Sequence, residues 1–106
     1  MKSSKFLMVL SLAALMSPVA HANLQLAQKG GCVACHAVDK KLVGPSFKDV
    51  ADKYKGQKDA AAKLADKVRH GGTGVWGTIP MPASGADKLN DADLKAVIEW
   101  VLKGAA

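Results

Sequence analysis

Two thiols and an imidazole lie within five consecutive residues, in the segment GGCVACHAV that runs from Gly30 to Val38. Cys32 and Cys35 are the only cysteines of the chain, and His36 follows the second of them directly. Such side chains bind metals, exchange electrons as a dithiol, attach cofactors or form disulfides, depending on the compartment. The compartment and the elements around the cluster therefore decide which chemistry applies.

The first 22 residues have the pattern of a secretory signal peptide. Lys2 and Lys5 form a short basic region, an apolar run follows over Phe6–Met16, and the small residues of AHA end the segment. We predict cleavage after Ala22, export to the periplasm and a mature domain over residues 23–106. The apolar run is shorter than the roughly 20 residues of a spanning helix, so we expect a mature protein that does not span the membrane.

The mature domain would be small for a hydrophobic core, because cleavage after residue 22 leaves 84 of the 106 residues. A core of that size rarely contributes more than about 3–5 kcal/mol, so a bulky cofactor, a metal or a disulfide is expected inside it. A disulfide between Cys32 and Cys35 would close a very small loop and stabilise little. The cluster must therefore hold something else.

Hydrophobic spacing predicts an all-α domain with four short helices separated by loops rich in glycine and proline. Ser46 and Asn90 are the expected N-caps of the second and fourth helices. The last helix is expected to pack across the first. The helices are expected over residues 24–31, after Ser46 up to Gly56, along the apolar face of Ala61, Leu64, Ala65 and Val68 up to Gly71, and from Asn90 to Gly104.

A long loop over residues 71–89 connects the third and fourth of these helices and is too rich in Gly and Pro for regular structure. Loops of this length in small domains are usually functional or disordered. Trp76, Ile79 and Met81 argue against disorder, since a disordered loop has little use for large apolar side chains. We therefore expect this loop to contribute to the site.

Three kinds of chemistry fit the cluster. A thioredoxin-like dithiol uses C-x-x-C at a strand-to-helix junction in a βαβ unit, and no such unit is expected here. Structural zinc needs four ligands, usually in two spaced pairs, whereas the mature chain has only Cys32, Cys35, His36 and His70. Covalent attachment of haem c has C-x-x-C-H as its signature and agrees with both the export signal and the missing core. We favour one covalently bound haem c.

Haem attachment gives each residue of the cluster a role. Cys32 and Cys35 would form thioethers with two haem vinyl groups, because their spacing places both sulfurs on one side of a helical turn. His36 would then bind the iron. The carbonyl of Pro45 is the candidate acceptor for the other N–H of the imidazole, a contact that orients ligating histidines.

Met81 is the expected sixth ligand of the iron. It is the only methionine beyond the signal segment, and Pro80 and Pro82 restrict the backbone on both sides of it. His70, near the end of the third helix, is the rival ligand. Protein ligands on both sides of the iron indicate an electron carrier, whereas an open or labile sixth site would indicate an enzyme or a gas sensor.

The haem propionates also need partners. The indole N–H of Trp76 would donate to a propionate if it is buried there, and the alternative is simple core packing. Lys67, Arg69 and His70 form a basic cluster at the end of the third helix. The sequence does not distinguish which of these three side chains contacts a propionate.

The charge of the chain restricts its possible partners less than the motifs restrict its cofactor. Loss of Lys2 and Lys5 from the 15 basic residues leaves 13 against 9 acidic ones, and no basic run interleaved with aromatics indicates nucleic-acid binding. We expect a monomer that docks briefly on redox proteins through an acidic or apolar patch of the partner. The expected contact surface combines apolar and basic residues around the haem edge, namely Val33, Ala34, Pro82, Ala83, Lys29, Lys40 and Lys41.

Four segments resemble, in order and spacing, the short single-haem class I cytochromes c of the bacterial periplasm: GCVACHAVD, VGPSFKDVADKY, GVWGTIPMP and AVIEWVLK. The resemblance covers nearly all of the mature chain. It implies a cytochrome c fold of four short helices around one haem, with His36 and Met81 as axial ligands, Pro45 bonded to His36, and Trp76 bonded to a propionate. It also implies a respiratory or denitrifying electron carrier, not an enzyme, that serves a cytochrome-type nitrite reductase or a terminal oxidase.

The chain departs from the family's pattern at two places. After PMP the family usually has a second proline and then an asparagine whose amide approaches the methionine sulfur, whereas Ala83 and Ser84 stand here. The Ser84 hydroxyl is the candidate substitute for that amide. A family arginine that often holds a propionate corresponds most nearly to Lys67, and both departures bear on the redox potential.

Overall fold

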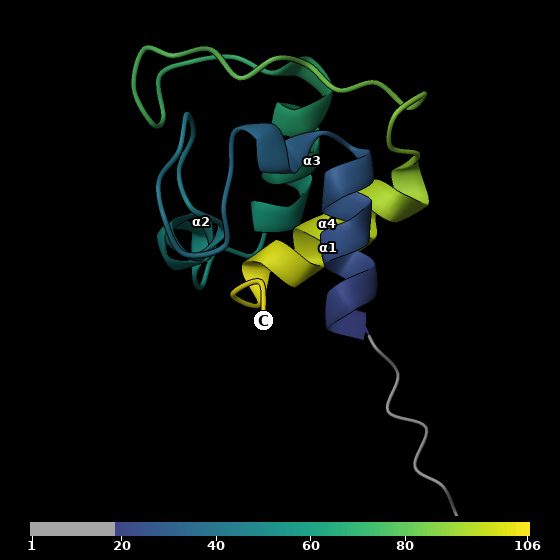
Figure 1. The fold of residues 1–106 in the computed structure, drawn as a ribbon. Helices are drawn as coiled ribbons and strands as arrows, with labels where there is room; N and C mark the ends of the chain where they lie inside the picture. Colours follow the sequence, from purple (N-terminus) through teal and green to yellow (C-terminus); the bar gives the residue numbers. More distant parts are fainter. Residues whose placement is uncertain (1–18) are drawn as a thin grey trace, which may run out of the picture.

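The computed structural model describes residues 19–106, and the expected signal segment lies almost wholly outside them, so cleavage after Ala22 stays a prediction. Within the described residues the chain forms helices and no strand, which confirms the all-α prediction. Figure 1 shows their arrangement. The elements are α1 (Val19–Lys29), the short 3-10 helix η1 (Cys32–Ala34), α2 (Phe47–Tyr54), α3 (Ala60–His70) and α4 (Asp91–Leu102).

Both expected N-caps are present. The Ser46 hydroxyl accepts a hydrogen bond from the N–H of Asp49 at 3.0 Å, and the Asn90 side chain accepts one from the N–H of Asp93 at 2.8 Å. Each bond satisfies one of the backbone donors that the first turn of a helix leaves free. Asp91 adds a negative charge to the first turn of α4, where the helix dipole favours it. These local signals place the starts of α2 and α4.

The first helix differs from its expected bounds. It begins at Val19 and ends at Lys29, because Gly31 adopts a left-handed backbone with φ 77° that separates it from η1. Cys32 therefore lies in a 3-10 turn of its own, and the N–H of His36 donates to the Cys32 carbonyl at 2.9 Å. The tight turn holds the whole C-x-x-C-H cluster in one local unit.

Helix α4 is the central element of the core and packs against α1, α2 and α3, so the predicted packing of the last helix across the first is confirmed. Figure 1 shows α1 crossing α4 and α2 lying to one side of them. None of the helices in residues 19–106 combines the length and apolar character that crossing a membrane requires. The buried core is formed by Ala27, Phe47, Val50, Leu89, Leu94, Val97, Ile98, Trp100, Val101 and Ala105.

The segment over residues 71–90 has no regular helix or strand, as its composition predicts. It leaves the end of α3, runs over the top of η1 in the view of Figure 1 and descends to the start of α4. Residues of this segment and of α2, α3 and α4 line one cavity.

Candidate functional site

A cavity of about 570 Å³ lies among η1, α2, α3, α4 and the segment 71–90. Its wall is largely apolar, with Leu64, Val68, Leu94 and Ile98 among the lining side chains. The six residues that the sequence assigns to cofactor binding all line this one cavity, although they come from three separate parts of the chain. They are Cys32, Cys35, His36, Pro45, Trp76 and Met81.

The imidazole of His36 is held on three sides. Its Nδ1 lies 2.7 Å from the carbonyl oxygen of Pro45, the contact expected between these two residues. Phe47 stacks against the ring with 5.5 Å between centroids and 26° between planes, and Gly44 lies so close that a Cβ on it would meet the ring. Since the carbonyl can only accept, Nδ1 carries the proton and the lone pair of Nε2 is available as a metal ligand.

Phe47 is itself held in place. Its N–H donates to the carbonyl of Ala37 at 2.9 Å, and Trp100 of α4 packs edge-on against its ring at 5.5 Å between centroids. The stack on His36 is therefore supported from the core. A contact between Phe47 and His36 has no local signature in the sequence, so it could not be predicted.

Backbone pairing holds the segment around Met81. The N–H of Gly72 donates to the Met81 carbonyl at 3.0 Å, and the N–H of Met81 donates to the Gly72 carbonyl at 2.9 Å. The N–H of Ser84 donates to the Val68 carbonyl at 2.8 Å. Two of these hydrogen bonds join the segment to Gly72, just after α3, and the third joins it to α3 itself, in addition to the restriction that the prolines impose.

Trp76 stands near the tip of a turn that the N–H of Gly74 closes by donating to the Gly77 carbonyl at 2.9 Å. Its side chain lines the cavity and is 44% exposed. The ammonium of Lys53 on α2 lies 5.2 Å from the centroid of its ring, a cation–π contact that ties this turn to α2. No pattern in the sequence predicts this pairing.

The three basic residues at the end of α3 lie in different environments. Lys67 lines the cavity, so it is the one of the three candidates that lies at the cavity wall. His70 points outward, with its Nδ1 2.9 Å from the Asp66 carboxylate. Arg69 binds the Ser84 carbonyl and Asp91 instead. Ser84, a candidate neighbour of the Met81 sulfur, uses its backbone for both of its bonds to α3.

The other two interpretations of the cluster find little support in this geometry. Burial raises the pKa of the Cys32 thiol, although a backbone hydrogen bond opposes the shift, whereas a redox dithiol needs a thiol with a lowered pKa. Structural zinc would need several ligands together, and residues 19–106 contain no group of three or more His, Cys, Asp or Glu placed to hold a metal ion.

The residues present fit a covalently attached haem. Two free thiols, an imidazole with an available Nε2 and a thioether meet on one cavity whose remaining wall is largely apolar. Its volume falls in the range of about 300–1,000 Å³ that is usual for small-molecule and cofactor sites. Nitrogen and soft sulfur donors are the axial ligands that haem iron takes in electron carriers.

Comparisons with known proteins agree with this fit. Residues 24–105 match the family model of cytochrome c. Cytochrome c-552 of Nitrosomonas europaea is 48% identical over 85% of this chain and 85% of its own length. Cytochrome c-552 of Hydrogenobacter thermophilus is 45% identical over 92% of this chain and 95% of its own. The crystal structure of wild-type Nitrosomonas europaea cytochrome c552 covers 76% of this chain and 98% of that one, with a TM-score of 0.70.

Proposed function

The chain belongs to the cytochrome c family, and we propose that it is a periplasmic one-electron carrier whose haem iron is held by His36 and Met81. As in the rest of the family, its cofactor is covalently attached haem c. When bound, this group supplies an iron that takes up or releases one electron between Fe(III) and Fe(II). The meeting of the thiol pair, the imidazole and the thioether on one apolar cavity carries the proposal.

Cys32 and Cys35 serve as the attachment points. Each thiol would add across one vinyl group of the haem, with its sulfur bonding to one carbon and its hydrogen passing to the other, so that nothing would be released. The short turn of η1 presents both side chains at the wall of the cavity. With the haem attached at this wall, His36, the residue after Cys35, would bind the iron through Nε2.

His36 and Met81 keep the coordination the same in both oxidation states. The Pro45 carbonyl and the Phe47 ring hold the imidazole, and the pairing with Gly72 holds the backbone of Met81. Because the two ligands would move little on electron transfer, the barrier to that transfer would be small. The thioether is a soft ligand that favours Fe(II), and the apolar wall favours the same less charged state, so both raise the potential.

A carrier is favoured over an enzyme or a gas sensor by the position of Met81. Met81 lines the cavity on a segment that backbone hydrogen bonds to Gly72 and Val68 hold. An enzyme or a sensor would need the sixth position open to a substrate or a diatomic gas. A thioether bound to the iron would close that position.

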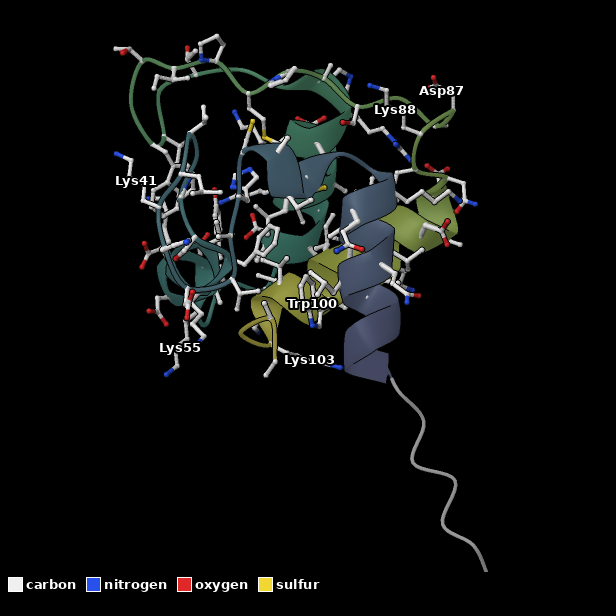
Figure 2. The ribbon with its side chains drawn as sticks, in the orientation of Figure 1. Lys41, Lys55, Asp87, Lys88, Trp100 and Lys103 are labelled. Atoms are coloured by element: carbon white, nitrogen blue, oxygen red, sulfur yellow. The ribbon has the colours of Figure 1, made fainter. Side chains whose placement is uncertain are left out.

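The redox partners are proposed to dock near the cysteine cluster and the Met81 segment. Val33, Ala34, Pro82 and Ala83 are exposed, which leaves an apolar surface beside the cavity. The expected basic residues Lys29, Lys40 and Lys41 are exposed as well, and Figure 2 shows Lys41 projecting outward. A transient partner with an acidic or apolar patch fits this surface, such as a cytochrome-type nitrite reductase or a terminal oxidase of a respiratory or denitrifying chain.

The test uses the holoprotein purified from the periplasm. A redox titration should follow a one-electron curve with a positive potential, and the reduced protein should bind carbon monoxide poorly at neutral pH. The oxidised protein should show the weak far-red band of a sulfur–iron bond. Tight carbon monoxide binding by the reduced protein would favour the enzyme or sensor instead.

A further inference from the structure

Arg69 has a place in the structure that the basic cluster does not suggest. Its side chain extends from the last turn of α3 and is only 19% exposed. One guanidinium nitrogen, Nη1, donates to the Ser84 carbonyl at 3.2 Å, and the other, Nη2, donates to the Asp91 carboxylate at 2.8 Å. Both partners follow Met81 in the chain, so the guanidinium joins α3 to the segment that leads from Met81 into α4.

The hydrogen bond from Arg69 to Ser84 helps to hold the stretch from Met81 to Ser84 against α3. At one end of this stretch, Met81 pairs with Gly72 through two backbone hydrogen bonds. At the other end, the N–H of Ser84 donates to the Val68 carbonyl, and its C=O accepts from Arg69. The Ser84 peptide groups are thus held by two consecutive residues of α3, and the Arg69 bond is the only one of these attachments that a side chain makes.

We propose that Arg69 is a positioning residue for Met81: it holds the Met81–Ser84 stretch against α3 and so keeps the thioether at the iron. The inference rests on the proposed role of Met81 as axial ligand. A propionate contact is thereby reassigned away from Arg69, because its guanidinium is occupied outside the cavity. Lys67, which lines the cavity, is the basic residue left for that contact.

The two bonds of Arg69 differ in importance. The Asp91 carboxylate is 95% exposed, so water screens its attraction to the guanidinium. The Ser84 carbonyl is partly buried and loses a charge-assisted donor if Arg69 is removed. We therefore expect the bond to Ser84 to contribute more to holding Met81 than the ion pair does.

The fork of the guanidinium also explains why arginine suits this position. Two nitrogens of one planar group bind two acceptors that belong to different elements. A lysine ammonium is a single compact charge and would not reach both acceptors in this geometry. Arg69→Lys should therefore restore only part of the function.

Release of this stretch would free the sixth position of the iron without unfolding the protein. The binding of a small competing ligand therefore measures how often that position is open. Imidazole binds a ferric haem only when the thioether has left, and its apparent affinity scales with the population of that open state. Loss of a hydrogen bond from a charged donor should raise this population about tenfold. Arg69→Met in the oxidised holoprotein should thus bind imidazole about tenfold more tightly.

Matched variants separate this role from general destabilisation. Lys63→Met removes another cation of α3, which pairs with Asp59 and touches nothing near Met81, and should leave imidazole binding unchanged. Asp91→Asn should change it less than threefold, and Arg69→Lys should fall between wild type and Arg69→Met. If Arg69→Met takes up no haem, the comparison of Arg69→Lys with Lys63→Met decides the question in the same way.

The inference is overturned if the Arg69 variants bind imidazole as the Lys63 control does, or if they shift the pH dependence of the potential while imidazole affinity stays constant. The second result would restore a propionate contact. Failure of the underlying axial assignment looks different, since the far-red band would then survive in Met81→Ala. With that band lost in Met81→Ala, the imidazole titration tests Arg69 alone.

Discussion

Gly44 lies against the His36 imidazole, so close that a Cβ on it would stand 2.6 Å from ring carbon Cε1 and 2.9 Å from Nδ1. No side chain other than hydrogen fits there without moving the ring. The next residue, Pro45, supplies the carbonyl that lies 2.7 Å from Nδ1. Gly44 and Pro45 therefore act together, one by leaving space for the imidazole and the other by orienting it.

Gly44→Ala should displace His36 and destabilise the holoprotein by about 1–3 kcal/mol, the usual cost of overpacking a tight contact. Guanidinium denaturation followed at the Soret band measures this. Gly85→Ala is the matched control, because its Cβ would meet only the carboxylate end of Asp87, an exposed side chain that can move away. Equal stability of the two variants would contradict the tight contact at His36.

Gly71→Ala should loosen Met81. Gly71 has φ 68°, and a Cβ there would collide with the Met81 carbonyl oxygen, which is a backbone atom that the pairing with Gly72 holds. The variant should lose much of the far-red band of the oxidised protein. Gly56→Ala is a control for backbone strain alone, because Gly56 has φ 79° and open space around it. Its far-red band should stay intact while its stability falls.

Met81→Ala should remove the far-red band, lower the potential and let the reduced haem bind carbon monoxide, because the thioether is the proposed sixth ligand. His70→Ala should leave the band intact, since its imidazole pairs with Asp66 on the exposed face of α3. Absorption spectra of the two oxidised proteins make the comparison. Absence of the band from the wild-type oxidised protein, or its survival in Met81→Ala, would contradict the axial assignment.

Trp76→Phe should shift the pH dependence of the potential to higher pH. The indole N–H is proposed to donate to a propionate, which stabilises the charged form of that group and lowers its pKa. An ionised propionate favours Fe(III), so the potential falls as pH rises through this pKa. Without the donor the pKa rises, and the fall should occur at higher pH in potentials measured from pH 5 to 9.

Lys53→Met is the control for Trp76→Phe. It removes the ammonium that lies 5.2 Å from the indole centroid but leaves the N–H in place. An exposed cation–π contact contributes about 0.5–1 kcal/mol, so stability should fall slightly while the pH midpoint of the potential stays near that of wild type. A midpoint that moves as far in Lys53→Met as in Trp76→Phe would contradict a specific role of the indole N–H.

The double variant Cys32→Ala, Cys35→Ala should be largely unfolded without haem. The cavity of about 570 Å³ is walled by side chains of the same core, including Leu94, Val97 and Val101, which would lose their packing partner. A chain with 84 residues after the expected cleavage has little other core to compensate. Far-UV circular dichroism measures the helix content, and cooperative thermal unfolding of this variant would contradict the expectation.

Features that depend on neighbours in the chain could be predicted from the sequence. Ser46 and Asn90 cap their helices through bonds to residues three positions on, and the pattern of glycines marked the ends of α2 and α3. The start of α1 was predicted less well, since the helix was expected from residue 24 and Val19 lies within the predicted signal segment. Helix patterns and caps are encoded over a few neighbouring residues, so they can be recognised in the sequence.

The sequence by itself also determined the chemistry of the site, because C-x-x-C-H and a single methionine beyond the signal segment leave few alternatives. Only the tertiary structure decided how that chemistry is held. It placed Phe47 on the His36 ring, paired Gly72 with Met81, and turned Arg69 toward Ser84 and away from the cavity. Side-chain direction depends on packing between segments distant in the chain, and no local pattern of residues records which of those segments will meet.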